Sequence, residues 1–357
     1  MTATAPPPDG LTDVPGIRVG HARVAGPRAL SGTTVVLAPE GGAVAAVDVR
    51  GGGPGTRETD ALDPRNVVQR IDALVLTGGS AYGLEAAAGV MAWLEERHRG
   101  VRVGPDPAHV VPVVPAACVF DLGRGGDFAA RPDAATGRAA VAAAAASGDH
   151  ARVATGAVGA GTGAVVGGLR GGVGTASVRL ESGITVGALV VVNAVGSAQD
   201  PATGVLYGSL FEDGGPPAAP SAAVREAAAA RLAEARAASV RPPLNTTLAV
   251  VATDAVLTRA QAQKVAGTAH DGIARAIRPV HLMNDGDTVF ALATGARELP
   301  AAPGPLALNE VLAAGADLVT RAIVRAVLAA PGGLRGPGGD FPSYRELYDP
   351  PHASYSW

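Results

Sequence analysis

Short runs of β-branched and other apolar residues recur along this chain, and glycine, proline or polar turn residues bound them. Runs of this kind predict β-strands. The predicted strands cover residues 17–21, 32–37, 43–49, 72–76, 114–122, 174–180, 184–193, 248–252 and 289–293. Longer segments, several of them rich in alanine, predict helices at residues 84–99, 133–147, 221–239, 258–277 and 309–329. With 357 residues, the chain is long enough for one large α/β domain or two smaller ones.

The composition predicts a substantial core built from small side chains. Hydrophobic residues make up 47% of the sequence and the mean hydropathy is +0.23, but aromatic residues supply only 3%. The core must therefore consist mainly of alanine, valine and leucine. The 49 glycines and 28 prolines predict many tight turns and close backbone approaches.

Charge and cysteine content exclude several classes of protein. A net charge of −3 argues against bulk attraction to nucleic acid or to an anionic membrane. Every long apolar stretch is interrupted by glycine, proline or charge, so no transmembrane helix is predicted. Cys118 is the single cysteine, which rules out an intrachain disulfide and a cysteine-based zinc cluster and fits a reducing cytoplasm. Residues 1–10 lack the pattern of a signal peptide and are predicted to form a disordered leader.

Polar residues lead directly into a predicted strand at Asn245-Thr246-Thr247. The simplest interpretation is an ordinary strand start. The triplet also fits the asparagine glycosylation pattern. A second interpretation is that the chain cuts itself between Asn245 and Thr246. Thr246 would then carry a free α-amine, whose ordinary pKa of about 7.7 to 8.0 suits it to take the proton of its own hydroxyl. Thr246 would become an N-terminal nucleophile.

Other polar positions lie at the ends of predicted strands. Asp285 and Asp287, separated by one glycine, precede the strand at 289–293, and both carboxylates could lie near one ammonium and raise its pKa. A calcium or magnesium loop and a simple turn are the alternatives. Asn193 ends another strand, either as a turn former or as a positioned hydrogen-bond donor. The glycine-rich segments 77–83 and 156–164 fit neither a P-loop nor a Rossmann motif.

Taken together, these segments resemble the L-aminopeptidase/D-Ala-esterase-amidase family, which includes β-aminopeptidases and nylon-oligomer hydrolases. The similarity runs from about residue 11 to residue 329, nearly the whole chain. Besides the two motifs above, the segments that carry it are residues 11–21, 77–86, 158–163 and 191–193. The resemblance implies an α+β fold, the four-layer α-β-β-α sandwich shared with ornithine acetyltransferases. It also implies cleavage into two fragments that stay associated.

The resemblance assigns roles to individual residues. Thr246 matches the nucleophile and Asn245 the residue before the cut. Asp285 and Asp287 match the pair that holds and polarises the nucleophile and its amine. Asn193 matches a residue that binds the reacting carbonyl or its oxyanion. Metal ions and organic cofactors are not required in this family, and a further homo-oligomer, a tetramer of processed heterodimers, is expected.

Domain boundaries follow from the predicted cut. Residues 11–245 form the large subunit and residues 246–330 the core of the small one, together one folded domain, while residues 331–357 are predicted to be a flexible tail. The chain departs from the nylon-oligomer hydrolases at two positions. Phe120 stands where they carry an active-site tyrosine, and Gly168 stands where they carry a lysine, with Arg170 nearby.

The predicted activity is hydrolysis of a small amide or peptide with a free amine, through an acyl-enzyme on Thr246. One alternative is acyl transfer to an amine, as in ornithine acetyltransferase. The other is a non-catalytic homologue that serves as a binding or structural protein. Neither nucleic acid nor membrane is an expected partner.

Overall fold

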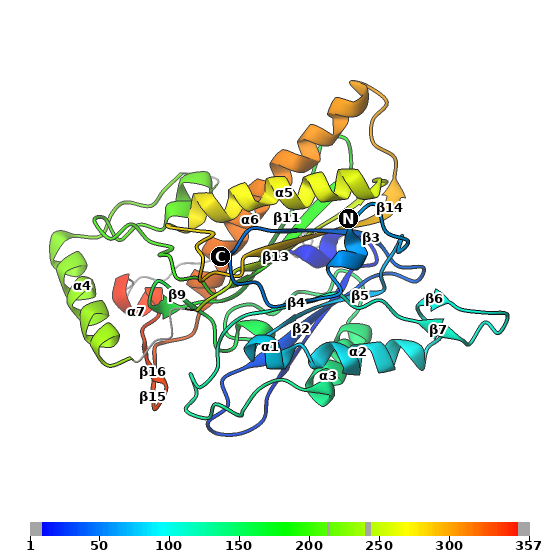
Figure 1. Cartoon of the computed structure of the whole chain (residues 1–357). Coiled ribbons are helices and arrows are strands. Elements are labelled where there is room, and N and C mark those ends of the chain that lie inside the picture. The colour runs from blue at the N-terminus through cyan, green and yellow to red at the C-terminus, as the bar shows by residue number, and fades with distance from the viewer. Residues whose placement is uncertain (1–8, 213–214, 240–243, 349–357) are drawn as a thin grey trace, which may run out of the picture.

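A computed structural model describes residues 9–212, 215–239 and 244–348 of the chain. Two five-stranded sheets form its centre (Figure 1). The first sheet has the order β1-β2-β5-β8-β4 and consists of β1 (Arg18–Arg23), β2 (Gly32–Leu37), β5 (Ala73–Thr77), β8 (Ala116–Cys118) and β4 (Thr56–Arg57). The second has the order β11-β12-β13-β14-β3 and consists of β11 (Gly172–Arg179), β12 (Thr185–Val192), β13 (Leu248–Ala255), β14 (Thr288–Arg297) and β3 (Val44–Val49).

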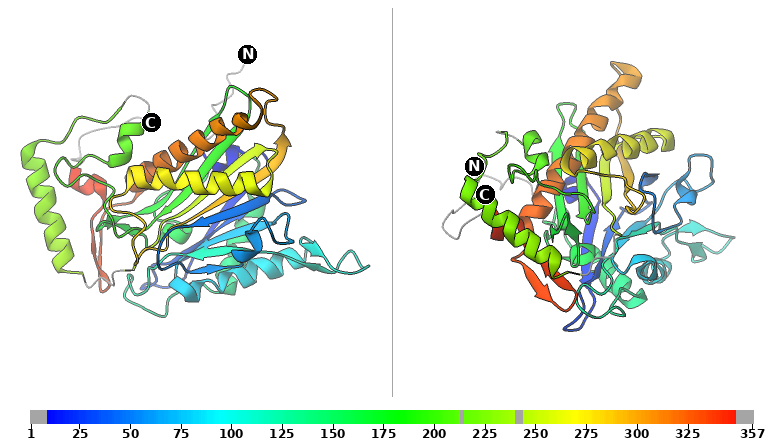
Figure 2. Two further views of the ribbon diagram at one scale, coloured as in Figure 1. Left: turned by 45° about the horizontal axis from the view of Figure 1, so that its top comes forward. Right: turned by 60° about the vertical axis from the view of Figure 1, so that its left-hand side comes forward.

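Helices cover the outer face of each sheet. The first sheet carries α2 (Ala86–Glu95) and α3 (Ala134–Ala146), and the second carries α5 (Arg259–Ala276) and α6 (Leu308–Ala329). The four layers follow one another in Figure 1 and in the left view of Figure 2. This arrangement confirms the predicted four-layer α-β-β-α sandwich.

The core fills three spaces, one between the sheets and one under each helical layer. Leucines, valines and Phe290 pack between the sheets, while alanines and valines dominate beneath the helices. Glycines in the strands let the helices approach closely. A Cβ at Gly20 would lie 2.2 Å from the carbonyl oxygen of Ala140 in α3, and one at Gly174 would lie 1.9 Å from that of Ala322 in α6. A side chain there would push the helix off the sheet.

The predicted helices match the observed ones to within a few residues, except that α1 (Ser80–Gly83) precedes α2 as a separate turn. Local signals set their starts. The side chains of Asp133, Ser221 and Thr258 accept hydrogen bonds from the first turns of α3, of α4 (Ala222–Ala237) and of α5. The shorter elements are η1 (Leu11–Asp13), η2 (Asp60–Leu62), β6 (Val101–Arg102), β7 (Val110–Val111), η3 (Gly159–Gly161), β9 (Val165–Val166), β10 (Leu169–Arg170), η4 (Tyr207–Phe211) and η5 (Gly304–Ala307).

The C-terminal segment departs from the sequence prediction. Instead of a flexible tail, the described residues after 331 form the hairpin β15 (Leu334–Gly336) and β16 (Gly339–Phe341), followed by α7 (Tyr344–Tyr348). Asp340 and Arg231 of α4 form two hydrogen bonds of 2.7 Å each, and Phe341 is buried. This bidentate ion pair holds a glycine-rich segment whose local sequence predicts little structure. Residues 349–357 of the predicted tail lie outside the described residues.

At the other end, the predicted leader overlaps the fold at its last two residues. The carboxylate of Asp9 accepts a hydrogen bond of 2.5 Å from Arg325 in α6, and the amide of Gly10 donates to Asp13. Residues 1–8 lie outside the described residues. Among the helices of the described chain, none combines the length and the apolar character needed to cross a membrane.

Candidate active site

The register of the second sheet brings Thr246 opposite Asn193. Val191 at the end of β12 pairs with Leu248 at the start of β13, and the antiparallel pairing extends beyond both strands. The amide of Thr246 donates a hydrogen bond of 2.7 Å to the main-chain oxygen of Asn193. The residues that follow β12 and those that precede β13 therefore lie side by side at one edge of the sheet.

Parallel pairing brings the two aspartates to the same edge. Leu248 of β13 lies beside Thr288 of β14, and Asn245 and Asp285 form a parallel bridge just before these strands. Parallel strands that begin together place the residues before them together as well. The structure thus gathers all the residues predicted for the site: Asn193, Asn245, Thr246, Asp285 and Asp287.

The hydroxyl of Thr246 faces the peptide bond that precedes it. The side chain is buried, and Oγ1 donates a hydrogen bond of 2.6 Å to the carbonyl oxygen of Asn245. The amide of Gly286 donates to the same oxygen across 3.1 Å. Gly286 itself packs against the hydroxyl, since a Cβ there would lie 2.5 Å from Oγ1. Hydroxyl, carbonyl and an N–H donor therefore converge on the bond between Asn245 and Thr246.

Backbone amides and the His281 side chain hold the two carboxylates of Asp285 and Asp287 close to this bond. Asp287 accepts 2.8 Å hydrogen bonds from the amide of Thr247 and from Nδ1 of His281. Asp285 accepts from the amides of Val195 at 3.3 Å and Leu282 at 3.2 Å. Burial raises the pKa of Asp285, and the neighbouring charge of Asp287 raises it further. Two buried carboxylates this close favour a positive charge beside them.

A glycine-rich loop packs directly on the two aspartates. The amide of Gly53 donates to the carbonyl oxygen of Asp285 at 2.8 Å, and a Cβ at Gly51 would lie 2.3 Å from the amide nitrogen of Asp287. The absence of side chains at Gly51 and Gly53 therefore lets this loop approach the backbone of the segment that carries the two aspartates.

The side chain of Asn193 is fully buried and held on its oxygen side. Its Oδ1 accepts from Nη1 of Arg124 at 2.5 Å and from the amide of Val165 at 3.0 Å. Its Nδ2 faces the carbonyl oxygen of Phe120 at 3.4 Å. Arg124 also donates from Nη2 to Oδ1 of Asn245 at 2.7 Å.

Two further residues belong to this cluster, Arg124 and His281, and neither was predicted from the sequence. Arg124 lies in a glycine-rich loop with no periodic signal, and only its contacts reveal it. His281 precedes the Asp285-Gly286-Asp287 motif by four residues and has a positive φ of 58°, which is unusual for a residue with a side chain. A histidine this close to a carboxylate motif was the available signal.

The two departures from the nylon-oligomer hydrolases have local explanations. Phe120 contributes its carbonyl oxygen to the site, a group that any residue would supply. Gly168 has a φ of 100° and Gly167 a φ of 57° in the two-residue turn between β9 and β10, a conformation that favours glycine. Arg170 donates to the carbonyl oxygen of Thr162 at 3.3 Å, and burial lowers its pKa. Its described side-chain hydrogen bond goes to this main-chain oxygen and to none of the predicted site residues.

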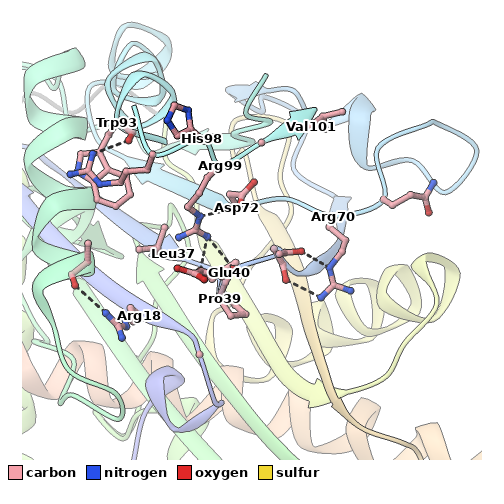
Figure 3. A pocket seen from close by; sticks show the side chains of 18 of the residues that line it. Arg18, Leu37, Pro39, Glu40, Arg70, Asp72, Trp93, His98, Arg99 and Val101 are labelled. Carbon is pink, nitrogen blue, oxygen red and sulfur yellow. Dashed lines mark hydrogen bonds and ion pairs between the residues drawn. The ribbon is translucent and has the colours of Figure 1, made fainter. Parts of the chain in front are cut away.

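A cavity of about 1040 Å³ lies at the opposite end of the sheets (Figure 3). It opens beside the residues that precede β3, whereas the cluster lies where β3 ends, roughly 20 Å away along the strands. Its arginines tie loops together: Arg70 donates to the carbonyls of Gly41 and Gly42, and Arg99 pairs with Asp72. In the described part of the chain, no group of three or more His, Cys, Asp or Glu has the arrangement of a metal site.

Two curated relatives and one solved structure illustrate what this chain is similar to. An uncharacterized aminopeptidase of Mycobacterium tuberculosis (strain ATCC 25618 / H37Rv) is 49% identical over 359 residues, which cover 95% of this chain and 98% of that protein. A 6-aminohexanoate-oligomer endohydrolase of Kocuria sp. (strain KY2) is 34% identical over 298 residues, or 82% of this chain and 77% of that protein.

The L-aminopeptidase D-Ala-esterase/amidase of Ochrobactrum anthropi, described as a variant of the Ntn hydrolase fold, superposes with a TM-score of 0.70. The match covers 97% of this chain and 94% of that one at 22% identity, so it bears on the fold alone.

The sequence profile of peptidase family S58 matches residues 9–338. These matches confirm the predicted resemblance and the predicted enzyme class, a hydrolase of C–N bonds in peptides or amides, and they favour hydrolysis over acyl transfer. The chain belongs to peptidase family S58.

Proposed function

We propose that this hydrolase cuts its own chain between Asn245 and Thr246 and then works as an aminopeptidase with Thr246 as its N-terminal nucleophile. One observation carries the proposal. The hydroxyl of Thr246 lies within 2.6 Å of the carbonyl oxygen of Asn245, and the amide of Gly286 donates to that same oxygen. A carbonyl under attack develops negative charge on its oxygen, and an N–H donor already in place stabilises that charge.

Self-cleavage proceeds in two steps. Oγ1 of Thr246 attacks the carbonyl carbon of Asn245, the C–N bond breaks, and the nitrogen of Thr246 leaves as an amine that takes up the hydroxyl proton. The product is an ester between Asn245 and the side chain of Thr246. Water then hydrolyses the ester, which leaves a carboxylate on Asn245 and frees both the hydroxyl and the α-amine of Thr246.

The freed α-amine of Thr246 then acts as the base in each catalytic turnover. It accepts the proton of Oγ1 as the oxygen attacks the carbonyl carbon of a substrate amide, and the substrate amine departs with a proton. Water releases the acyl group. Asn193 binds the substrate oxyanion through Nδ2, and Asp285 and Asp287 hold the ammonium form of Thr246. The buried pair of carboxylates supports the last assignment, because a positive charge beside them offsets the cost of their burial.

The aminopeptidase activity is taken from the name of the mycobacterial relative, which is similar over nearly its whole length. The Kocuria relative is named for cleavage of 6-aminohexanoate oligomers, which is a second candidate substrate class. Both substrate classes are amides of amino acids. A panel of aminoacyl anilides and a 6-aminohexanoate oligomer separates the two.

In this proposal the two fragments stay together. β13 and β14 belong to the small fragment, but they lie between β12 and β3 of the large one and pair with both. Separation would break the second sheet in two places. The predicted tetramer of processed heterodimers and the cytoplasmic location, which rests on the single cysteine, remain parts of the proposal, and light scattering of the purified protein measures the subunit number.

The central test is the variant Thr246→Ala. Purified wild-type protein should give two bands on a denaturing gel, and the smaller should begin at Thr246 on N-terminal sequencing. Thr246→Ala should give one full-length band without amidase activity. A Thr246→Ala protein that still hydrolyses its substrate would exclude Thr246 as the nucleophile.

A further inference from the structure

The guanidinium of Arg124 connects the amide that binds the oxyanion with the residue before the scissile bond. Nη1 donates to Oδ1 of Asn193 at 2.5 Å, and Nη2 donates to Oδ1 of Asn245 at 2.7 Å. Nη1 also donates to the carbonyl oxygen of Gly163 at 2.6 Å. The guanidinium is planar and has donors only, so one rigid group fixes both side chains relative to each other.

This contact helps to set which way the Asn193 amide points. Its Oδ1 faces two donors, the guanidinium and the amide of Val165. A rotation of the amide by half a turn would place its NH₂ group against both donors. Arg124 and the amide of Val165 therefore keep Oδ1 on their side and leave Nδ2 to donate elsewhere. An oxyanion site needs this orientation, because only Nδ2 can donate to a negatively charged oxygen.

The loop that carries Arg124 is fixed from several directions. Oδ1 of Asp121 accepts from the amide of Gly79 at 2.7 Å, and the amide of Arg124 donates to the carbonyl oxygen of Asp121 at 3.2 Å. The hairpin β15–β16 packs on the other side, where a Cβ at Gly338 would lie 2.0 Å from the carbonyl oxygen of Arg124. The guanidinium is thus held by a rigid support, which a positioning residue requires.

We propose that Arg124 is a positioning residue for both reactions of Thr246: it orients the Asn193 amide for substrate hydrolysis and holds Asn245 in place for self-cleavage. The inference rests on the proposed function. It adds that one side chain, whose described hydrogen bonds go to Gly163, Asn193 and Asn245 and not to the hydroxyl of Thr246 or the scissile bond, controls the rates of both steps.

The test compares Arg124→Ala and Arg124→Lys with the control Arg28→Ala. Arg28 is exposed and donates to the carbonyl oxygen of Gly126 in the same loop. Full-length protein is followed on denaturing gels for the rate of cutting, and kcat and KM are measured per cut chain with an aminoacyl anilide. We expect Arg124→Ala to slow cutting at least tenfold and to lower kcat ten- to a hundredfold, with KM changed less than threefold. Arg124→Lys should recover part of both rates, and Arg28→Ala should match the wild type.

A double variant separates positioning from general structure. If Arg124 acts through Asn193, then Arg124→Ala added to Asn193→Ala should lower kcat no further. The inference would be overturned if the two substitutions lowered kcat additively, or if Arg124→Ala changed KM alone. It would also be overturned if the cutting rate and kcat of Arg124→Ala lay within threefold of those of Arg28→Ala. Should Arg124→Ala precipitate, Arg124→Gln takes its place, since it keeps a planar donor without the charge. Each of these outcomes leaves the result for Thr246→Ala unchanged, so failure of this inference is distinct from failure of the proposed function.

Discussion

The main chains of Thr246 and Asn193 are joined by a hydrogen bond of 2.7 Å from the amide of the first to the carbonyl oxygen of the second. The same nitrogen becomes the leaving group in the proposed self-cleavage and the base in the proposed turnover. The strand pairing that builds the second sheet therefore also positions the nitrogen on which both reactions depend.

Gly286 should be needed for self-cleavage because it has no side chain. A Cβ there would lie 2.5 Å from Oγ1 of Thr246 and 2.9 Å from the carbonyl oxygen of Gly53. Gly286→Ala should displace the hydroxyl and slow cutting at least about tenfold, which corresponds to about 1.4 kcal/mol of barrier. A gel time course of freshly expressed protein measures this rate. Gly148→Ala is the control, since a Cβ there meets nothing within 4 Å. Equal rates for the two variants would show that the space around Gly286 does not matter.

His281 should stabilise the fold through its hydrogen bonds to Asp287. Its Nδ1 and its amide donate to Oδ2 at 2.8 and 3.1 Å, and Asp287 is buried. His281→Asn tolerates the positive φ but alters the contact, and we expect it to lower the free energy of unfolding by about 1 to 3 kcal/mol. Urea denaturation measures the change.

His98 supplies a matched control for this variant, because it has a φ of 53° and is exposed. His98→Asn should leave the free energy of unfolding nearly unchanged. If both asparagine variants lower the free energy of unfolding equally, the loss comes from the backbone conformation, and the contact with Asp287 contributes nothing.

Asp121 should make stability depend on pH. Burial raises its pKa from 3.8 to about 6, so the folded state binds the proton more tightly than the unfolded state does. Stability from this group is present at low pH and is lost as the pH rises from about 4 to about 6. Asp121→Asn keeps an oxygen for the amide of Gly79 without the charge. It should raise the free energy of unfolding at pH 7.5 by up to about 3 kcal/mol, at 1.36 kcal/mol for each pKa unit.

Urea denaturation of Asp121→Asn in the Thr246→Ala background, which should remain one chain, tests this at several pH values. The difference between the asparagine and aspartate proteins should shrink as the pH falls toward 4. A difference that is constant with pH would mean that the carboxyl does not titrate in this range.

The ion pair between Arg231 and Asp340 should hold the C-terminal hairpin to α4, and after the proposed cut it joins the two fragments. Both side chains are mostly buried, at 16% and 13% exposure. Asp340→Asn should therefore lower the free energy of unfolding by about 1 to 3 kcal/mol, because it removes the charge nearest the guanidinium and leaves only Glu346, at 3.7 Å.

Asp317, which pairs with Arg275 at 56% exposure, provides the comparison. Asp317→Asn should cost less than about 1 kcal/mol. Thermal denaturation of both variants measures the contrast, and an equal or larger loss for Asp317→Asn would show that the hairpin contact is not structurally important.

Much of the site could be predicted because strand ends are visible in local sequence. Asn193 ends one apolar run, and Thr246 and Asp285 precede two others, so each was expected at the end of a strand. The resemblance to a known family supplied their roles. The contacts of Arg124 could not be predicted, because the sequence of a glycine-rich loop does not specify which distant side chains its arginine will contact. The hairpin at 334–341 was missed for a related reason: its order comes from Asp340 and Arg231, which lie 109 residues apart.

By itself, the sequence determined the helices, most strands and the small-residue composition of the core, because periodicity and capping act between neighbouring residues. Only the tertiary structure decided that β13 lies between β12 and β14, antiparallel to one and parallel to the other. That order brings Asn193, Thr246 and Asp285 within reach of one another. Backbone pairing between distant strands is selected by the packing of two whole sheets and their helices, and no short segment of the chain specifies it.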